Sequence, residues 1–201
     1  MSTVGDMWDR RFSEQAWLTE ADPLLVELAA SLPVGRALDL GSGPGRNSLW
    51  LACLGWTVTA VDASQVALTQ AAQQAKKLGV ALATIHADVT VWQPTSGAFD
   101  LIVVANLHPG IEALSAVLAG AADALVPGGH LFVIGHDVVN LGRHGPPDSS
   151  RLLSIERLSE AMPPVVAIEK LERRIRPPDG THSEDLSAQD VAVLAWATKR
   201  H

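Results

Sequence analysis

Cysteine is nearly absent from this sequence, with one copy, Cys53, among 201 residues. One thiol cannot form an intramolecular disulfide and excludes most thiolate metal sites, so we expect no metal centre and a reducing, cytoplasmic setting. Cys53 shares an apolar stripe at helical spacing with Leu49, Ala52 and Trp56. We therefore predict that Cys53 is a buried packing residue and not a nucleophile.

Excess positive charge and long apolar runs are also lacking. The chain has 15 Lys and Arg residues against 22 Asp and Glu residues, and its formal net charge of -7 argues against a DNA- or RNA-binding surface. No stretch approaches the roughly 18 apolar residues of a membrane-spanning helix, and residues 1–11 carry charges where a signal peptide needs an apolar core. We expect a soluble monomer or homodimer with no nucleic-acid partner and no membrane partner.

Strand-like and helix-like patterns alternate from residue 36 onward, which is typical of parallel strands joined by crossover helices. The predicted strands span 36–40, 57–61, 81–85, 99–105 and 130–134, and the predicted helices span 46–55, 64–78 and about 110–125. The run 99–105 is apolar enough for a strand buried on both faces. In the helix 64–78, Ser64 is the predicted N-cap, and the predicted buried stripe is Ala67, Ala71, Ala75 and Leu78. The pattern predicts a single doubly wound α/β domain.

The flanking segments have different patterns. Residues 12–32 are predicted to be helical, with Leu24, Leu25, Leu28 and Leu32 on one apolar face. Residues 140–150 are rich in Gly, Pro, Asp and Ser without periodicity, which indicates an irregular loop of a kind that often carries function. A short helix at 154–161 and a hairpin of strands 165–176 and 190–198, with a turn at 177–181, complete the chain.

A glycine-rich turn connects the first predicted strand to the following helix. Gly41, Gly43 and Gly45 remove side chains where the backbone turns sharply and approaches a ligand, and the helix N terminus directs its N–H groups and positive dipole end to the same place. Asp62 ends the second strand, 21 residues beyond Gly41, a spacing at which a carboxylate accepts hydrogen bonds from ribose hydroxyls. The loop therefore predicts a nucleotide-like cofactor.

The spacing of the glycines discriminates between cofactors. The dinucleotide fingerprint G-x-G-x-x-G requires glycine at the position of Arg46, so the loop disfavours NAD(P), and an NAD(P)-dependent oxidoreductase is the alternative enzyme class. The Gly-Lys-Ser/Thr of a P-loop is absent, which leaves no visible machinery for phosphate transfer. A non-catalytic protein that binds an adenosyl ligand is a third hypothesis.

Five motifs, in order, resemble those of class I S-adenosylmethionine-dependent methyltransferases. They are Asp39–Gly45 (DLGSGPG), Val61-Asp62, Ala87-Asp88, Phe99–Val103 (FDLIV) and Leu125–Leu131 (LVPGGHL). The chain is further similar to small bacterial tellurite-resistance and thiopurine-methyltransferase-like enzymes through Trp8–Arg11 (WDRR), Gly45–Asn47 (GRN) and Gly135–Asp137 (GHD).

The resemblance spans residues 8–199 and implies a Rossmann-like fold. Its seven-stranded sheet would be mostly parallel, with an antiparallel C-terminal hairpin strand and helices on both faces, and its cofactor would be S-adenosylmethionine. The single domain 1–201 would then consist of an N-terminal helical cap (1–34), a cofactor-binding core (35–137) and a loop with the C-terminal hairpin (138–201).

The resemblance also implies cofactor contacts. The glycine loop would lie along the methionine portion, where Asp39 orients the loop or the ammonium group. Because Ser64 is better placed to cap the next helix, Asp62 is left free to bind the ribose. The predicted contacts are Trp8, Asp39, Gly41, Ser42, Gly43, Gly45, Arg46, Asp62, Ala63, Asp88 and Val89 beside the adenine, and Asn106 and Leu107 on the methionine side. For Arg46, a surface role and a contact with the cofactor carboxylate are both open.

Candidate catalytic residues follow the central strands, where open parallel sheets bind ligands. His108 follows the strand 99–105, and His136 and Asp137 follow the strand ending at residue 134, so all three could act as a base or as acceptor contacts. A base is needed only where the acceptor carries a proton. The sequence lacks the Asn/Asp-Pro-Pro-aromatic motif of amino-methylating nucleic-acid enzymes and a Pro-Cys pair. Together with the acidic charge, this predicts direct methyl transfer to a small molecule through oxygen, sulfur or another soft or anionic nucleophile.

Overall fold

The computed structural model describes residues 3–15, 17–176 and 189–201. The helices are α1 (Val4–Glu14), α2 (Pro23–Ala29), α3 (Arg46–Cys53), α4 (Gln65–Leu78), α5 (Ile111–Ala124) and α6 (Ile155–Ala161), with two 3-10 helices, η1 (Val138–Asn140) and η2 (Ser149–Arg151). The strands are β1 (Arg36–Leu40), β2 (Thr57–Asp62), β3 (Ala83–His86), β4 (Phe99–Ala105), β5 (Leu125–His136), β6 (Val166–Arg176) and β7 (Asp190–Lys199).

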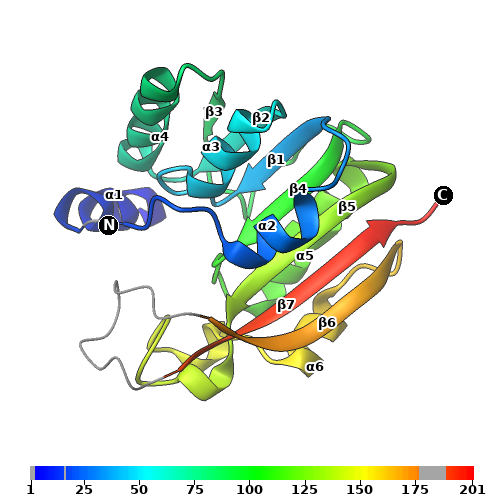
Figure 1. Ribbon diagram of the computed structural model, residues 1–201. Helices are drawn as coiled ribbons and strands as arrows, with labels where there is room; N and C mark the ends of the chain where they lie inside the picture. Colours follow the sequence, from blue (N-terminus) through cyan, green and yellow to red (C-terminus); the bar gives the residue numbers. More distant parts are fainter. Residues whose placement is uncertain (1–2, 16, 177–188) are drawn as a thin grey trace.

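One seven-stranded sheet organises these elements in the order β3-β2-β1-β4-β5-β7-β6 (Figure 1). The first five strands in this order are parallel, and β7 runs antiparallel to both β5 and β6. The direction of winding reverses between β1 and β4, so ligands are expected beyond the carboxyl ends of these two strands. Because β7 is antiparallel, its first residue, Asp190, lies at this same edge of the sheet. The predicted fold class is confirmed.

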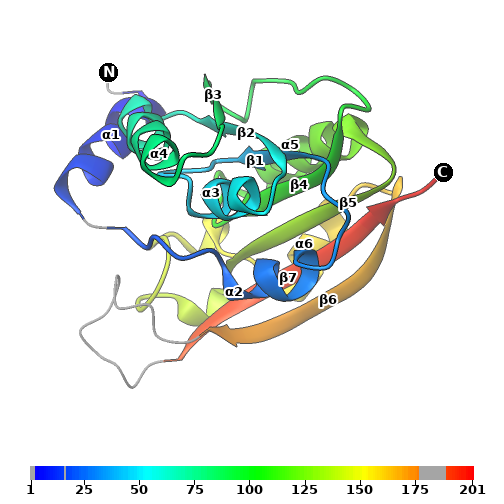
Figure 2. The same cartoon turned by 45° about the horizontal axis from the view of Figure 1, so that its top comes forward.

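Two apolar cores cover the two faces of the sheet. One joins α2 and α3 to one face, and the other joins α5 and α6 to the opposite face (Figure 2). The central strand β4 contributes to both, since Leu101 and Val103 belong to the first core and Ile102 and Val104 to the second. Each fully buried side chain of this kind stabilises the fold by about 1.5–3 kcal/mol. The predicted two-sided burial of this strand is confirmed. Within the described residues, no helix has the length and apolar character needed to cross a membrane.

The N-terminal segment contains two helices where one was predicted at 12–32. α1 begins after Thr3, which forms a capping box with Asp6. α2 begins at Pro23, after Asp22 has capped it by accepting a backbone N–H. Proline lacks an N–H and its ring clashes with the preceding turn, so it is tolerated at the start of a helix and prevents one continuous helix here. The predicted leucine face is confirmed, because Leu24, Leu25, Leu28 and Leu32 all belong to or pack against the α2–α3 core.

Two predictions about burial were wrong. Cys53 is exposed, and Leu78 is 55% exposed although the three alanines of its stripe are buried. In both helices the apolar pattern runs to the last residue, where the chain turns away through a glycine of positive φ, Gly55 or Gly79. The periodicity thus continues past the surface against which the helix packs.

The C-terminal hairpin pairs as predicted, with β6 antiparallel to β7. Its predicted turn at 177–181 lies outside the described residues. β5 begins earlier than predicted: Phe99 pairs with Leu125 while Leu101 pairs with His130, so the extra residues of β5 form a bulge.

Candidate cofactor and acceptor sites

The three loop glycines occupy positions that other residues would strain. Gly41, Gly43 and Gly45 have φ angles of 73°, 52° and 84°, in the left-handed region that favours glycine. A Cβ at Gly41 would lie 3.0 Å from Leu107, and a Cβ at Gly45 would lie 2.9 Å from the Cβ of Ala71. The loop therefore runs as bare backbone at the switch point, as a close approach to a ligand requires.

The carboxylate of Asp62 fixes this loop to the end of β2. Its Oδ2 accepts the N–H of Gly43 and its Oδ1 accepts the N–H of Ser64, both at 2.8 Å. The residue is 7% exposed, and burial raises its pKa. Ser64 caps α4 as predicted, through the N–H of Ala67. Asp62 thus has two backbone partners, but a carboxylate has about four acceptor positions and retains capacity for ribose hydroxyls, so the ribose contact stays a prediction.

Asp39 joins β1 to α3 beneath the loop. Its buried carboxylate accepts the hydroxyl proton of Ser48, in the first turn of α3, at 2.6 Å. Burial raises the pKa of Asp39 to about 6, against the lowering effect of the Ser48 bond. This position suits the predicted role of orienting the loop. Ser42, the remaining loop residue predicted as a contact, is 9% exposed.

α1 borders a cavity on the cofactor side of the switch point. Oδ1 of Asp9 accepts the hydroxyl proton of Ser64 at 2.5 Å and the N–H of Val66 at 3.0 Å, which holds α1 against the start of α4. Next to this contact lies a cavity of about 300 Å³, at the lower end of the range of about 300–1,000 Å³ for small-molecule pockets. The lining residues are Thr3, Val4, Gly5, Asp6, Asp9, Ala63, His86, Ala87 and Asp88.

The predicted adenine contacts differ in their surroundings. Ala63 and Asp88 line the cavity. Asp88 also accepts the backbone N–H and the hydroxyl proton of Thr90, at 2.9 and 2.7 Å. The side chain of Val89 is 8% exposed and packs in the α5–α6 core, so only its backbone is available to a ligand.

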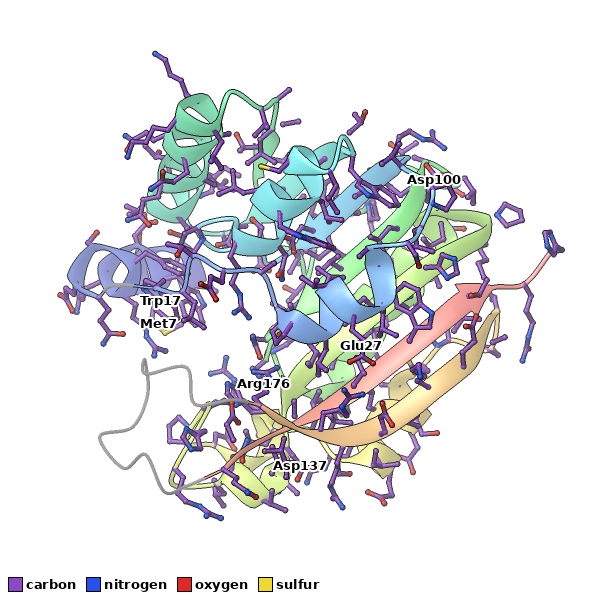
Figure 3. The ribbon with its side chains drawn as sticks, viewed as in Figure 1. Met7, Trp17, Glu27, Asp100, Asp137 and Arg176 are labelled. Carbon is purple, nitrogen blue, oxygen red and sulfur yellow. The ribbon has the colours of Figure 1, made fainter. Side chains whose placement is uncertain are left out.

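An aromatic cluster on the N-terminal segment supports the glycine loop. Trp8 stacks on Phe12 with ring centroids 5.6 Å apart, and Trp17 packs on Phe12 at 4.7 Å; Figure 3 shows Trp17 beside α1. The ring of Phe12 would lie 3.3 Å from a Cβ at Gly43. Trp8, a predicted cofactor contact, therefore supports the loop through Phe12 and is not among the described residues that line the cavity.

Asn106 and Leu107 connect this side of the site to the acceptor side. Leu107 packs against Gly41. Asn106 has a φ of 56° and is the one non-glycine residue with positive φ in the described parts of the chain. Such a conformation costs on the order of 1 kcal/mol and is typical of functional sites. The side-chain Oδ1 of Asn106 accepts a hydrogen bond from Nη2 of Arg176 at 2.9 Å.

Both nitrogens of the His108 ring are hydrogen-bonded to backbone groups. Its Nδ1 lies 2.9 Å from the carbonyl oxygen of Arg151, and its Nε2 accepts the backbone N–H of His136 at 3.4 Å. A carbonyl can only accept and an N–H can only donate, so Nδ1 carries the proton and the ring is neutral. Burial, together with the charge of His136, lowers the pKa of His108 to about 3. His108 therefore orients its neighbours and has no ring nitrogen left to act as a base.

His136 is paired with a carboxylate from β7. Its Nδ1 lies 3.0 Å from Oδ1 of Asp190, and both residues are 7% exposed. The same Asp190 oxygen accepts a hydrogen bond from Nδ2 of Asn140 at 2.8 Å. Burial favours a higher pKa for Asp190, but the hydrogen bond from His136 and the charges of His136 and Arg176 outweigh it, so the pKa is lowered.

Asp137 is occupied elsewhere, although it follows His136 directly. Its fully buried carboxylate accepts a hydrogen bond from Nε of Arg173 at 2.6 Å and from the N–H of Val139 at 2.9 Å. The geometry thus gives Asp137 a structural ion pair with β6. The carboxylate beside His136 is that of Asp190 from β7.

Arg176, Asp190 and Asp22 were missed from the sequence. Arg176 is 8% exposed and has Nη1 3.7 Å from Asp190 and Nη2 3.9 Å from Asp22. Asp22 also lies 3.5 Å from Nη2 of Arg46, which places Arg46 in this network. The available signal was the predicted hairpin, since Arg176 and Asp190 are paired at the end where β6 stops and β7 begins. An antiparallel last strand begins at the ligand edge, so its first residue is a site candidate.

Known proteins share both the sequence motifs and this architecture. Residues 37–129 match the family model described as "Methyltransferase domain". Ubiquinone biosynthesis O-methyltransferase from Caulobacter sp. (strain K31) is 35% identical over 102 residues, 49% of this chain and 39% of the relative. Release factor glutamine methyltransferase from Bordetella pertussis is 30% identical over 55% of this chain and 52% of the relative. Ribosomal RNA small subunit methyltransferase C from Alcanivorax borkumensis is 30% identical over 50% of this chain and 32% of the relative. The chain thus spans between a third and a half of the length of these curated relatives.

Solved structures share the fold over nearly the whole chain. One, from work on the conversion of a disulfide bond into a thioacetal group during echinomycin biosynthesis, has a TM-score of 0.79 at 20% identity and covers 98% of this chain and 93% of that one. TehB from Haemophilus influenzae has a TM-score of 0.73 at 19% identity, and the match covers 96% of this chain and 67% of TehB. Residues 37–129 thus match a methyltransferase domain, which supports the predicted S-adenosylmethionine-dependent family, and the solved structures confirm the predicted fold.

Proposed function

We propose that this chain transfers the methyl group of S-adenosylmethionine directly to a small molecule. The observation that carries the proposal is the bare glycine loop, held by the buried carboxylate of Asp62 and placed near a cavity of about 300 Å³. When bound, the cofactor supplies a methyl group activated by a positively charged sulfur. The protein then has to bind, align and exclude water, and to remove a proton where the acceptor has one.

The residues of the loop and the cavity fit this cofactor. Gly41 and Gly43 would lie along its methionine portion, with Asp39 beneath them. Asp62 would accept ribose hydroxyls with its remaining acceptor positions. Asp88 and the cavity beside α1 would hold the adenine.

The net charge of the chain supports a small acceptor, and the partial match to the relatives gives no reason to transfer their larger acceptors to this chain. The net charge of -7 disfavours a polyanionic nucleic acid. The relatives named for an RNA and for a protein are matched over about half their length or less, so their acceptors do not carry over. The single cysteine supports a reducing, cytoplasmic location.

Calorimetry with S-adenosylhomocysteine tests cofactor binding. Asp62→Ala is expected to weaken binding by at least about 100-fold, because buried ribose hydroxyls lose their partner and the loop loses its tie to β2. Asp123→Ala, at an exposed position on α5, is the matched control and should bind like the unaltered protein. Absence of binding of either adenosyl compound to the unaltered protein would remove the proposal.

Incubation with radiolabelled S-adenosylmethionine tests the acceptor class. The protein is offered a panel of thiols, phenols, amines, oxyanions and halides, and in parallel bulk RNA and a protein extract. We expect label in a small product. Label found only in the RNA or protein fraction would contradict the small-molecule acceptor while leaving methyl transfer intact.

A further inference from the structure

His136 has the geometry of an oriented base. A carboxylate only accepts, so the contact between Nδ1 of His136 and Oδ1 of Asp190 places the ring proton on Nδ1 and leaves the lone pair on Nε2. Asp190 is itself held by Asn140, whose side chain also bonds the carbonyl oxygen and the N–H of Val191 at 2.7 and 3.1 Å. The pair is therefore held by further hydrogen bonds and is about nine-tenths buried.

The ring of His136 also has close neighbours on two sides. His108 stacks on it with centroids 5.5 Å apart and planes 27° apart. On another side the backbone of Gly145 is so close that a Cβ there would lie 2.7 Å from Cγ of His136. Both ring nitrogens of His108 are hydrogen-bonded to backbone groups. Of these two stacked rings, only His136 can therefore offer a basic nitrogen to a ligand.

The position of the pair places it on the acceptor side. His136 ends β5, next to β4, and β4 continues into Asn106 and Leu107, which packs on Gly41 of the cofactor loop. Arg176 spans from Asn106 to Asp190. The base is thus linked to the strand end that touches the cofactor loop, across the switch point from the adenine cavity.

The positive charge of Arg176 does not make this region attractive to anions. Its charge is offset by Asp190 and Asp22, at 3.7 and 3.9 Å, and Arg46 shares Asp22. Among these four side chains the two cations and two carboxylates balance. The four offer no excess positive charge to an acceptor that arrives as an anion, whereas an acceptor that carries a proton finds an oriented base.

We propose that the acceptor is a protic nucleophile, a hydroxyl or an amine, and that Nε2 of His136 removes its proton while Asp190 acts as a positioning residue. This rests on the proposed function. As the acceptor's lone pair forms the bond to the methyl carbon, the carbon–sulfur bond breaks and its electron pair stays on sulfur, which becomes a neutral thioether. The acceptor's proton passes to Nε2 and then to water. No oxidant, reductant or further reactant is needed.

Nitrogen NMR of the histidine rings tests the geometry without any acceptor. In protein saturated with S-adenosylhomocysteine, neutral His136 is expected as the Nδ1–H tautomer, and Asp190→Asn should reduce that preference. Asp100→Asn is the control, because Asp100 lies at the opposite end of β4 (Figure 3). An Nε2–H tautomer of His136 in the unaltered protein would overturn the proposal.

Turnover with paired acceptors tests the chemistry. Phenols and primary amines are compared with acceptors already anionic at the assay pH, namely thiophenolate, hydrosulfide and iodide. His136→Gln should lower kcat for the protic acceptors by about 100-fold or more with KM changed little, since general bases contribute about 10²–10⁴-fold. His130→Gln, near the middle of β5 and stacked on Trp196, should behave like the unaltered protein.

Asp190→Asn should lower kcat for the protic acceptors about tenfold with KM changed little, because the carboxylate that holds the ring proton on Nδ1 of His136 is lost. Together with the reduced Nδ1–H preference in the NMR test, this result separates a positioning role from a merely structural one.

Two results would refute the proposal. One is that no protic acceptor is methylated; the other is that His136→Gln methylates protic acceptors at the unaltered rate. S-adenosylhomocysteine binding is measured on the same samples. Intact binding with either result refutes the base alone, whereas lost binding refutes the proposed function.

Discussion

The cofactor side and the acceptor side of this site are built by different means. The cofactor side is shaped mainly by backbone conformation, namely the three loop glycines of positive φ, and by the bond from the N–H of Gly43 to the carboxylate of Asp62. On the acceptor side, side chains from distant segments meet: His136 and Asp190 are 54 residues apart, and Asn106 and Arg176 are 70 apart. A backbone loop suits the cofactor, which is the same for all members of a family. The side chains of the β6–β7 hairpin can change with the acceptor without altering the glycine loop.

The two sides also bury opposite kinds of titratable group. Asp39 is a carboxylate whose pKa burial raises to about 6, and His108 is an imidazole whose pKa burial lowers to about 3. Both are therefore held closer to neutrality than in water, and they respond to pH with opposite signs. Substitutions at Gly45, Asp39 and His108 separate the two sides, with expected effects that decrease in that order.

Gly45→Ala should disrupt the cofactor side alone. Alanine at a φ of 84° is strained and its Cβ would lie 2.9 Å from Ala71, so the free energy of unfolding should fall by about 2–4 kcal/mol and S-adenosylhomocysteine binding by at least about 100-fold. Urea unfolding and calorimetry measure both. Gly55→Ala is the control, with a φ of 95° but no atom within 4 Å of the added Cβ. Equal losses in the two variants would show that close packing of the loop is unimportant.

Asp39→Asn should stabilise the fold at neutral pH. The folded-state pKa of Asp39, about 6, is above the ordinary 3.8, so the native state holds this proton more tightly and stability falls as pH rises from about 4 to 6. The difference of about two pKa units corresponds to about 3 kcal/mol. Asparagine mimics the protonated form, so the variant should gain about this much at pH 7.5. Urea unfolding at pH 4 and 7.5 measures it, with Asp100→Asn as control, and a variant no more stable than the unaltered protein at pH 7.5 contradicts the prediction.

His108→Gln should change the acid response of the acceptor side. The pKa of His108 is about 3 in the fold against an ordinary 6.5, so its contribution to stability is present above pH 6.5 and is lost as the pH falls and the unfolded chain takes up the proton. At pH 5 the loss is about 2 kcal/mol. The variant should therefore lose about 2 kcal/mol less than the unaltered protein between pH 7.5 and 5. His130→Gln, at a half-buried position whose pKa burial also lowers, should show a smaller change. If the free energy of unfolding changed with pH equally in His108→Gln and in the unaltered protein, His108 would titrate alike in the folded and unfolded chain, which would contradict the prediction.

The sequence by itself determined the strand and helix alternation, the glycine loop, the Ser64 cap and the ordered motifs of the family. All of these depend on local periodicity or on conformations that few residues can adopt. The predicted helix 12–32 was too long, because leucine spacing alone does not show that a new helix begins at Pro23. The predicted burial of Cys53 and Leu78 was wrong, because periodicity does not show where a packing surface ends.

Only the tertiary structure decided how the site residues pair. That Asp62 holds the glycine loop, that His108 is neutral and bound to backbone, and that His136 faces Asp190 and not Asp137 all depend on groups brought together across the sheet edge. The antiparallel β7 supplies the reason: it returns the chain to the ligand edge and sets its first residue, Asp190, beside the end of β5. No local pattern encodes that meeting, because it arises from strand pairing between segments more than 50 residues apart.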